Sequence, residues 1–275
     1  MKKTVNKFAV DGHQMAYQDV GQGPVIIFGH SYLWDSKMWA PQIEVLSQNY
    51  RCIVPDFWAH GQSEFAPDST HSLVDYAQQI IALMDHLEVE QFSIIGLSVG
   101  GMWGSEVVNL ASERVKSLVM MDTFVGLEPE VTHKKYFTML ETISAAQMVP
   151  EPIIDIVTPM FFARNAEQES PNLVAGFREK LSNLKGQQAA EVARMGRMVF
   201  GRRDQIEDIE KFTLPVLIAV GQEDIPRPVL ESYLMNDCIT GSELIQVPKA
   251  GHIANLEQPE FVTAMLLNFL SKVYS

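Results

Sequence analysis

The sequence predicts an α/β fold in which a mostly parallel central sheet is flanked by helices. Short apolar runs alternate with longer helical patterns along most of the 275 residues. The apolar runs show no period-2 alternation, which is typical of strands that are covered on both faces. Alternating strands and helices favour right-handed βαβ units and therefore a parallel sheet.

Six apolar runs are candidates for buried strands. They span residues 25–28, 51–55, 91–96, 117–121, 216–220 and 242–247. The segment of residues 4–20 precedes them and contains Asp11-Gly12, which is a hairpin signal. We expect this segment to form two antiparallel strands at the edge of the sheet.

Five segments between these runs have helical patterns. They span residues 39–47, 73–87, 102–110, 228–235 and 259–273. The second of them has one apolar face, because its apolar side chains follow i, i+3, i+4 spacing: Leu73, Ala77, Ile80, Ile81, Met84 and Leu87.

One long stretch interrupts the alternation of strands and helices. Residues 123–211 contain no convincing buried strand, and their pattern is that of several helices separated by prolines. So long a helical insertion between two strands favours a cap over one edge of the sheet, and an ordinary set of flanking helices is the alternative. We therefore expect a core formed by residues 1–122 and 212–275, with a helical cap at 123–211 after the strand that ends near Asp122.

Composition argues against several classes of protein. Lys and Arg number 21 against 34 Asp and Glu, a formal charge of −13, whereas nucleic-acid and anionic membrane surfaces attract basic proteins. No stretch reaches the ~20 apolar residues that span a bilayer. The two cysteines, Cys52 and Cys238, do not form a disulfide framework, and no long apolar segment follows the basic start. We expect a cytoplasmic protein.

The third apolar run leads into Gly96-Leu97-Ser98-Val99-Gly100, directly before a helical pattern. A Gly-x-Ser-x-Gly string is weak evidence alone, but a strand before it and a helix after it predict a nucleophile elbow. The two glycines let a sharply bent chain pass close to its neighbours. The N-terminus of the following helix would direct free N–H groups at a developing oxyanion.

A serine hydroxyl needs a base to act as a nucleophile at neutral pH. His252 lies in a loop after the last predicted strand, at the same sheet edge as Ser98; a structural loop histidine is the alternative reading. His30 also lies at this edge, nearer the N-terminal strands. An acid must orient the base, and either Asp224, after the fifth strand, or Asp122, after the fourth, can reach an imidazole there. We favour Asp224.

With these motifs in place, the chain resembles the α/β-hydrolase superfamily over nearly its full length. It is most similar to the small serine esterases, enol-lactonases and cofactor-free haloperoxidases. The order Ser98, Asp224, His252 is the order of the superfamily's catalytic triad. The resemblance also rests on Gly29-His30-Ser31-Tyr32, Asp56, His60-Gly61-Gln62-Ser63, Gly96 to Gly101, Gly221 to Asp224, Gly251-His252 and Pro259-Glu260.

The resemblance implies an oxyanion hole formed by the backbone N–H groups of Tyr32 and Val99. Two positions depart from the family pattern, because Ser31 and Ala59 stand where the family usually has glycine. Since a side chain restricts the backbone, Ser31 bears on the placing of the Tyr32 N–H group. Serine at position 98 argues against the haloalkane dehalogenases and epoxide hydrolases, which have an aspartate nucleophile.

These residues predict a serine hydrolase that forms an acyl-enzyme on Ser98. The expected substrate is a small, uncharged, moderately apolar carboxylic ester, thioester or lactone, because the candidate pocket residues are mainly apolar. Those candidates lie in the cap and beside Tyr32, in the loop after the first apolar run, here named the oxyanion loop: Leu33, Trp34, Phe124, Met160 and Phe161.

Other functions remain open on the same residues. The triad could serve perhydrolysis, C–C bond hydrolysis or acyl transfer, and a non-catalytic binding protein of this fold is a more remote alternative. No His or Cys residues have metal-ligand spacing, and no glycine-rich nucleotide motif follows a strand. We therefore expect no metal and no cofactor. The expected partner is a small-molecule substrate, with no nucleic acid and no membrane, and the oligomeric state is left open.

Overall fold

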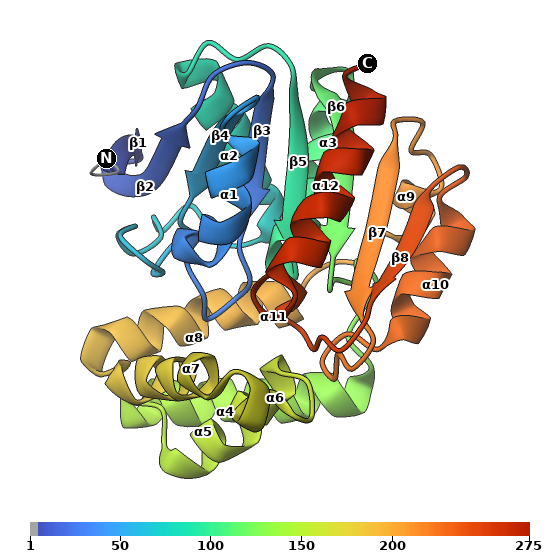
Figure 1. The fold of residues 1–275 in the computed structure, drawn as a ribbon. Coiled ribbons are helices and arrows are strands. Elements are labelled where there is room, and N and C mark those ends of the chain that lie inside the picture. Colours follow the sequence, from blue (N-terminus) through green and yellow to red (C-terminus); the bar gives the residue numbers. More distant parts are fainter. Residues whose placement is uncertain (1–4) are drawn as a thin grey trace.

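The computed structural model describes residues 5–275, so the first residue of the predicted hairpin, Thr4, lies outside the described part. The predicted α/β class is confirmed: within the described residues an eight-stranded sheet has helices on both faces (Figure 1). The strand order is β1-β2-β4-β3-β5-β6-β7-β8. β1 pairs with β2 and β2 with β4 in antiparallel fashion, and the remaining neighbours are parallel.

The predicted buried strands are all present, with ends shifted by at most two residues. The bounds are β1 (Val5–Val10), β2 (His13–Val20), β3 (Val25–Gly29), β4 (Arg51–Pro55), β5 (Phe92–Leu97), β6 (Val115–Met121), β7 (Val216–Gly221) and β8 (Glu243–Val247). The predicted hairpin is β1 and β2, and of these two strands β1 alone is at the edge of the sheet.

Helices pack against both faces of the sheet. They are η1 (Ser36–Trp39), α1 (Ala40–Leu46), α2 (Leu73–His86), α3 (Val99–Ala111), η2 (Ser112–Arg114), α10 (Val229–Cys238), α11 (Ala254–Glu257) and α12 (Pro259–Val273). A capping box between Ser72 and Asp75 begins α2. α3 begins three residues before the predicted start, because Gly100 and Gly101 weaken the helical pattern of its first turn.

The core lies in two layers, one on each face of the sheet. In β3, Ile27 belongs to the cluster that packs against α2 and α3, while Ile26 and Phe28 belong to the cluster that packs against α1 and α12. Figure 1 shows α1 and α12 in front of the sheet, with α2 and α3 behind it. Because each strand is covered on both faces, its apolar run is continuous rather than alternating.

Between β6 and β7 the chain is helical. The elements are α4 (Glu130–Ala146), α5 (Glu151–Val157), η3 (Thr158–Phe161), α6 (Ala166–Glu169), α7 (Pro171–Asn183), α8 (Gly186–Phe200) and α9 (Ile206–Ile209). Helices α4 to α8, here named the cap helices, lie together beyond the ends to which the parallel strands point (Figure 1). The division into a core of residues 1–122 and 212–275 and a cap of 123–211 stays a prediction. Over residues 5–275, no helix is long and apolar enough to cross a bilayer.

Candidate active site

Ser98 occupies the turn between β5 and α3. Its φ is 57° and its ψ is −118°, a combination that non-glycine residues rarely adopt. A Cβ atom on Gly96 would overlap the backbone of Gly100, and one on Gly100 would overlap the backbone of Gly29. The two glycines of the motif therefore allow β5, α3 and β3 to meet closely enough to form this turn.

The imidazole of His252 is held by Asp224. His252 Nδ1 lies 2.9 Å from Asp224 Oδ2, and both side chains are buried. Asp224 follows β7, and its other carboxylate oxygen accepts the backbone N–H of Arg227 at 2.9 Å. His252 follows β8 and packs edge-on against the ring of Phe161. This arrangement brings together the imidazole and the favoured acid from loops 28 residues apart.

The competing acid, Asp122, lies at the end of β6 and is fully buried. Its Oδ1 accepts the backbone N–H of Gly221 at 2.7 Å, and it makes no hydrogen bond to an imidazole in the described residues. Burial, together with the neighbouring charge of Asp224, raises the pKa of Asp122 well above the ordinary value. Asp122 thus favours the neutral form, whereas Asp224 accepts hydrogen bonds.

Tyr32 follows β3 and Val99 is the first residue of α3. Within residues 5–275, neither backbone N–H donates a hydrogen bond, so both donors are available to a ligand oxygen. The next residue, Leu33, donates its N–H to His60 Nε2 at 3.1 Å. Burial lowers the pKa of His60 to about 3, which keeps the ring neutral and able to accept this bond.

The two departures from the family pattern have different structural consequences. Ser31 is buried and does not have a positive φ, so its side chain causes no left-handed strain. The left-handed residue of this loop is instead Leu33, with φ 69°. Ala59 does adopt φ 60°, a conformation that favours glycine.

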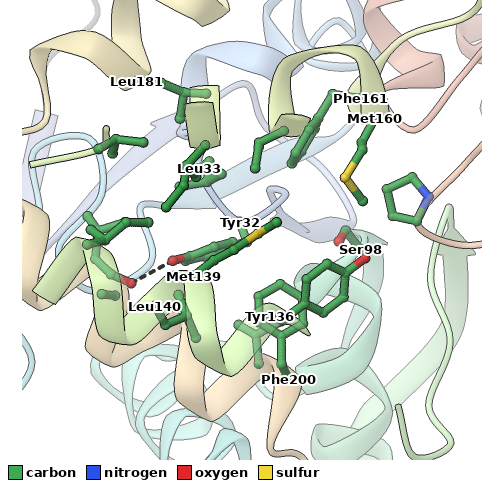
Figure 2. Close-up of a pocket in the computed structure, with 18 of the residues that line it drawn as sticks. Tyr32, Leu33, Ser98, Tyr136, Met139, Leu140, Met160, Phe161, Leu181 and Phe200 are labelled. Atoms are coloured by element: carbon green, nitrogen blue, oxygen red, sulfur yellow. Dashed lines mark hydrogen bonds between the residues drawn. The ribbon is translucent and has the colours of Figure 1, made fainter. Parts of the chain in front are cut away.

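The lining of a cavity under the cap helices includes both Ser98 and His252, and Figure 2 shows Ser98 at this cavity. Three of the predicted pocket residues, Leu33, Met160 and Phe161, line it as well. Two others do not, because Trp34 stacks on Phe177 with the ring centroids 4.9 Å apart and Phe124 is buried elsewhere. The other apolar lining residues are Met102, Met139, Leu140, Ile143, Val149, Ile153, Val157, Leu181, Leu184, Val192, Ala193, Val199, Phe200 and Pro226.

Sequence reasoning missed most of the cap side of this cavity. A signal was present in α4, where Tyr136, Met139, Leu140 and Ile143 follow i, i+3, i+4, i+7 spacing and line the cavity together. The hydroxyl of Tyr32 donates to the carbonyl of Val192 in α8 at 2.8 Å, which ties the oxyanion loop to the cap helices (Figure 2).

The polar lining is small. Besides Ser98, His252 and Tyr32, it consists of Glu128, Tyr136 and Arg227. In the described part of the chain, no group of three or more His, Cys, Asp or Glu side chains could hold a metal ion. The chemistry that this arrangement offers is therefore that of a hydroxyl, an imidazole, a carboxylate and two backbone donors at the end of an apolar cavity.

Comparison with known proteins identifies similar hydrolases. A family model described as the alpha/beta hydrolase fold matches residues 23–151. The 3-oxoadipate enol-lactonase 2 of Acinetobacter baylyi is 27% identical, over 89% of this chain and 88% of its own length. The 2-hydroxy-6-oxo-6-(2'-aminophenyl)hexa-2,4-dienoic acid hydrolase of Metapseudomonas resinovorans is 29% identical, over 95% of this chain and 89% of its own.

Among solved structures, a thermophilic esterase from Thermogutta terrifontis superposes with a TM-score of 0.89 at 24% identity, covering 100% of both chains. At this identity the likeness shows the fold. Taken with the family match over residues 23–151, it shows that the chain has the α/β-hydrolase fold. The two relatives are an enol-lactonase and a dienoic acid hydrolase, and the chain is a hydrolase of this fold.

Proposed function

We propose that the protein is a serine hydrolase that cleaves a small, moderately apolar carboxylic ester, thioester or lactone. The observation that carries this proposal is the 2.9 Å contact between His252 and Asp224, in a cavity that also contains the strained Ser98. A buried Asp–His pair orients the general base that a serine nucleophile needs.

In the proposed first step, Ser98 Oγ attacks the acyl carbon and His252 Nε2 takes its proton. Asp224 keeps the imidazole in the tautomer with a proton on Nδ1 and stabilises the imidazolium that forms. The N–H groups of Val99 and Tyr32 bind the tetrahedral oxyanion. His252 then returns the proton to the departing alcohol, thiol or ring oxygen, which leaves an acyl group on Ser98.

In the second step, water attacks the acyl-enzyme. His252 accepts a proton from the water, and the same backbone donors stabilise the second oxyanion. Collapse of this intermediate releases the carboxylic acid, and the proton passes from His252 back to Ser98 Oγ.

The substrate class follows from the cavity and the cap. Most of the lining is aliphatic or aromatic, which suits an apolar acyl or alcohol group. We propose that residues 123–211 act as a cap domain that closes this pocket. The partner is then a small molecule, without nucleic acid or membrane, and the two-cysteine composition supports the cytoplasm as the location.

C–C bond hydrolysis on the same triad is the second candidate. It is favoured by the 29% identity to a hydrolase whose name denotes a 2-hydroxy-6-oxo-dienoic acid substrate, while the similar enol-lactonase favours ester chemistry. Parallel assays with a lactone, an alkyl ester and a vinylogous 1,5-diketone separate the two. Perhydrolysis and acyl transfer are tested in the same reactions by adding peroxide or an alcohol acceptor.

The direct test of the proposal is the Ser98→Ala variant on a p-nitrophenyl ester. We expect kcat to fall by at least about 10⁴-fold, since removal of a nucleophilic serine leaves only binding and oxyanion stabilisation. Ser112→Ala, at the exposed start of η2, is the control and should keep wild-type activity. Hydrolysis by folded Ser98→Ala at the wild-type rate would overturn the assignment.

A further inference from the structure

Arg227 is an unusual member of the cavity lining. It is 3% exposed and lies three residues after Asp224. Its Nη2 donates to Glu128 Oε2 at 2.7 Å and its Nε to the carbonyl of Pro226 at 2.5 Å. Its Nη1 is buried and has no hydrogen-bond partner within the described residues. A buried donor without a partner is costly, more so on a charged group, so such a group calls for a partner.

Two acidic side chains lie against the guanidinium of Arg227. Glu128 is shared, because its Oε1 also accepts from Arg202 Nη1 at 2.8 Å, so two guanidinium groups face one carboxylate. A second acid, Glu231, lies 3.6 Å from Arg227 Nε. Burial raises the pKa of Glu231 to about 7, so its negative charge is incomplete at neutral pH. These contacts use Nη2 and Nε of Arg227, and Nη1 is left without a hydrogen-bond partner within the described residues.

A second hydrogen-bonding group lies at the same end. Tyr136 lines the cavity from α4, and Figure 2 shows its phenol directed toward Ser98. Burial raises the pKa of Tyr136, while the nearby charge of Arg227 opposes that rise. The guanidinium of Arg227 and the phenol of Tyr136 are thus close to each other, and aliphatic side chains of the cap helices line much of the rest of the cavity.

We propose that Arg227 Nη1 and the Tyr136 hydroxyl bind a carboxylate group of the substrate. The inference rests on the proposed function and narrows it to a monoanionic ester, such as the half-ester of a short dicarboxylic acid. A guanidinium presents planar donors that match a carboxylate. With a formal charge of −13, the protein repels highly charged anions, which favours a single carboxylate on an otherwise apolar molecule. This replaces the uncharged substrate that the sequence alone predicts.

The test compares esters that differ only at the far end of the acyl chain. Monoethyl succinate, glutarate and adipate are paired with ethyl butanoate, pentanoate and hexanoate, and acid release is followed by titration at constant pH. For at least one chain length, we expect the wild-type kcat/KM to favour the carboxylate ester by about 10-fold or more, the size of one charge-assisted hydrogen bond.

Substitutions then assign this preference to Arg227. In Arg227→Gln, the ratio of kcat/KM for the carboxylate ester to that for the neutral ester should fall at least about tenfold, and Arg227→Lys should keep part of it. Arg202 can still pair with Glu128 in these variants, which favours folding. The matched control is Arg203→Gln, a more exposed arginine paired with Glu106 outside this cavity. It should leave the ratio unchanged.

Each possible result of these ester assays leads to a single conclusion. Hydrolysis of neutral esters without a preference for any carboxylate ester overturns the inference and leaves the proposed function intact. An equal fall for both esters in Arg227→Gln overturns it too, because that result means a structural role in the Asp224 loop. Failure of the wild type to hydrolyse any ester overturns the proposed function itself.

Discussion

At the scale of single residues, the site depends on which carboxylate meets the imidazole. The sequence leaves Asp122 and Asp224 open, because both follow strands that end at the same edge. The structure separates them, since Asp224 lies 2.9 Å from His252 while Asp122 accepts a backbone N–H of the β7 end. Burial and the neighbouring charge of Asp224 raise the pKa of Asp122, and Asp224 is the acceptor for His252.

Substitution by asparagine distinguishes the two acids. Asp224→Asn should lower kcat by about 10³- to 10⁴-fold, because an amide no longer stabilises the correct imidazole tautomer. Asp122→Asn should lower it less than about tenfold, because asparagine resembles the protonated carboxyl and can still accept the Gly221 N–H. The measurement is steady-state hydrolysis of a p-nitrophenyl ester. A reversed order of the two losses would assign the acid to Asp122.

At the scale of elements, the cap helix α8 packs directly on the oxyanion loop. Tyr32 donates to the Val192 carbonyl, and one turn further on Gly196 faces the Tyr32 hydroxyl and the side chain of Leu140. A Cβ atom on Gly196 would come within 2.6 Å of both. The absence of a side chain there lets α8, α4 and the oxyanion loop meet.

A pair of glycine substitutions tests this packing. Gly196→Ala should reduce the free energy of unfolding by about 1–3 kcal/mol through overpacking, and it should also lower kcat by displacing Tyr32. Gly176→Ala is the matched change in α7, where nothing lies within 4 Å of the added Cβ, and it should stabilise by about 0.5–1 kcal/mol. Urea unfolding measures both. Equal effects of the two changes would contradict the described contact.

At the scale of the whole molecule, much of the sheet could be predicted from the sequence. Buried strands have continuous apolar runs, and the carboxyl ends of β5, β7 and β8 bring Ser98, Asp224 and His252 to one edge. The pocket was harder to predict, because neighbouring aromatic residues face different ways. Trp34 stacks on Phe177 of α7, while the adjacent Leu33 lines the cavity. Such choices depend on contacts between distant segments rather than on local pattern.

The segment between η3 and α6 is joined to the loop that carries His252. Glu257 in α11 accepts the N–H of Ala163 at 2.8 Å and the N–H of Gly251 at 2.7 Å. Burial raises the pKa of Glu257 from 4.5 to about 7, although these two bonds oppose the rise. Since the folded state then holds this proton more tightly than the unfolded state, the stabilising contribution is complete below about pH 4.5 and is lost as the pH rises through about 7.

This linkage predicts a difference in pH dependence. The free energy of unfolding of the wild type should fall more steeply from pH 5 to pH 8 than that of Glu257→Gln, because glutamine does not titrate. Denaturant unfolding at several pH values measures both slopes. Glu260→Gln, an exposed change in α12, should keep the wild-type slope. Coincident slopes for the wild type and Glu257→Gln would show that Glu257 ionises alike in both states.

We expect His252 to activate Ser98 as a nucleophile, and covalent labelling measures this reactivity at a single side chain. The folded wild type should react with a fluorophosphonate probe at one residue, and mass spectrometry of the digested protein should locate the adduct on Ser98. The adduct should be lost in His252→Gln, because the hydroxyl then has no base. An adduct on another residue, or none on the folded wild type, would contradict the account.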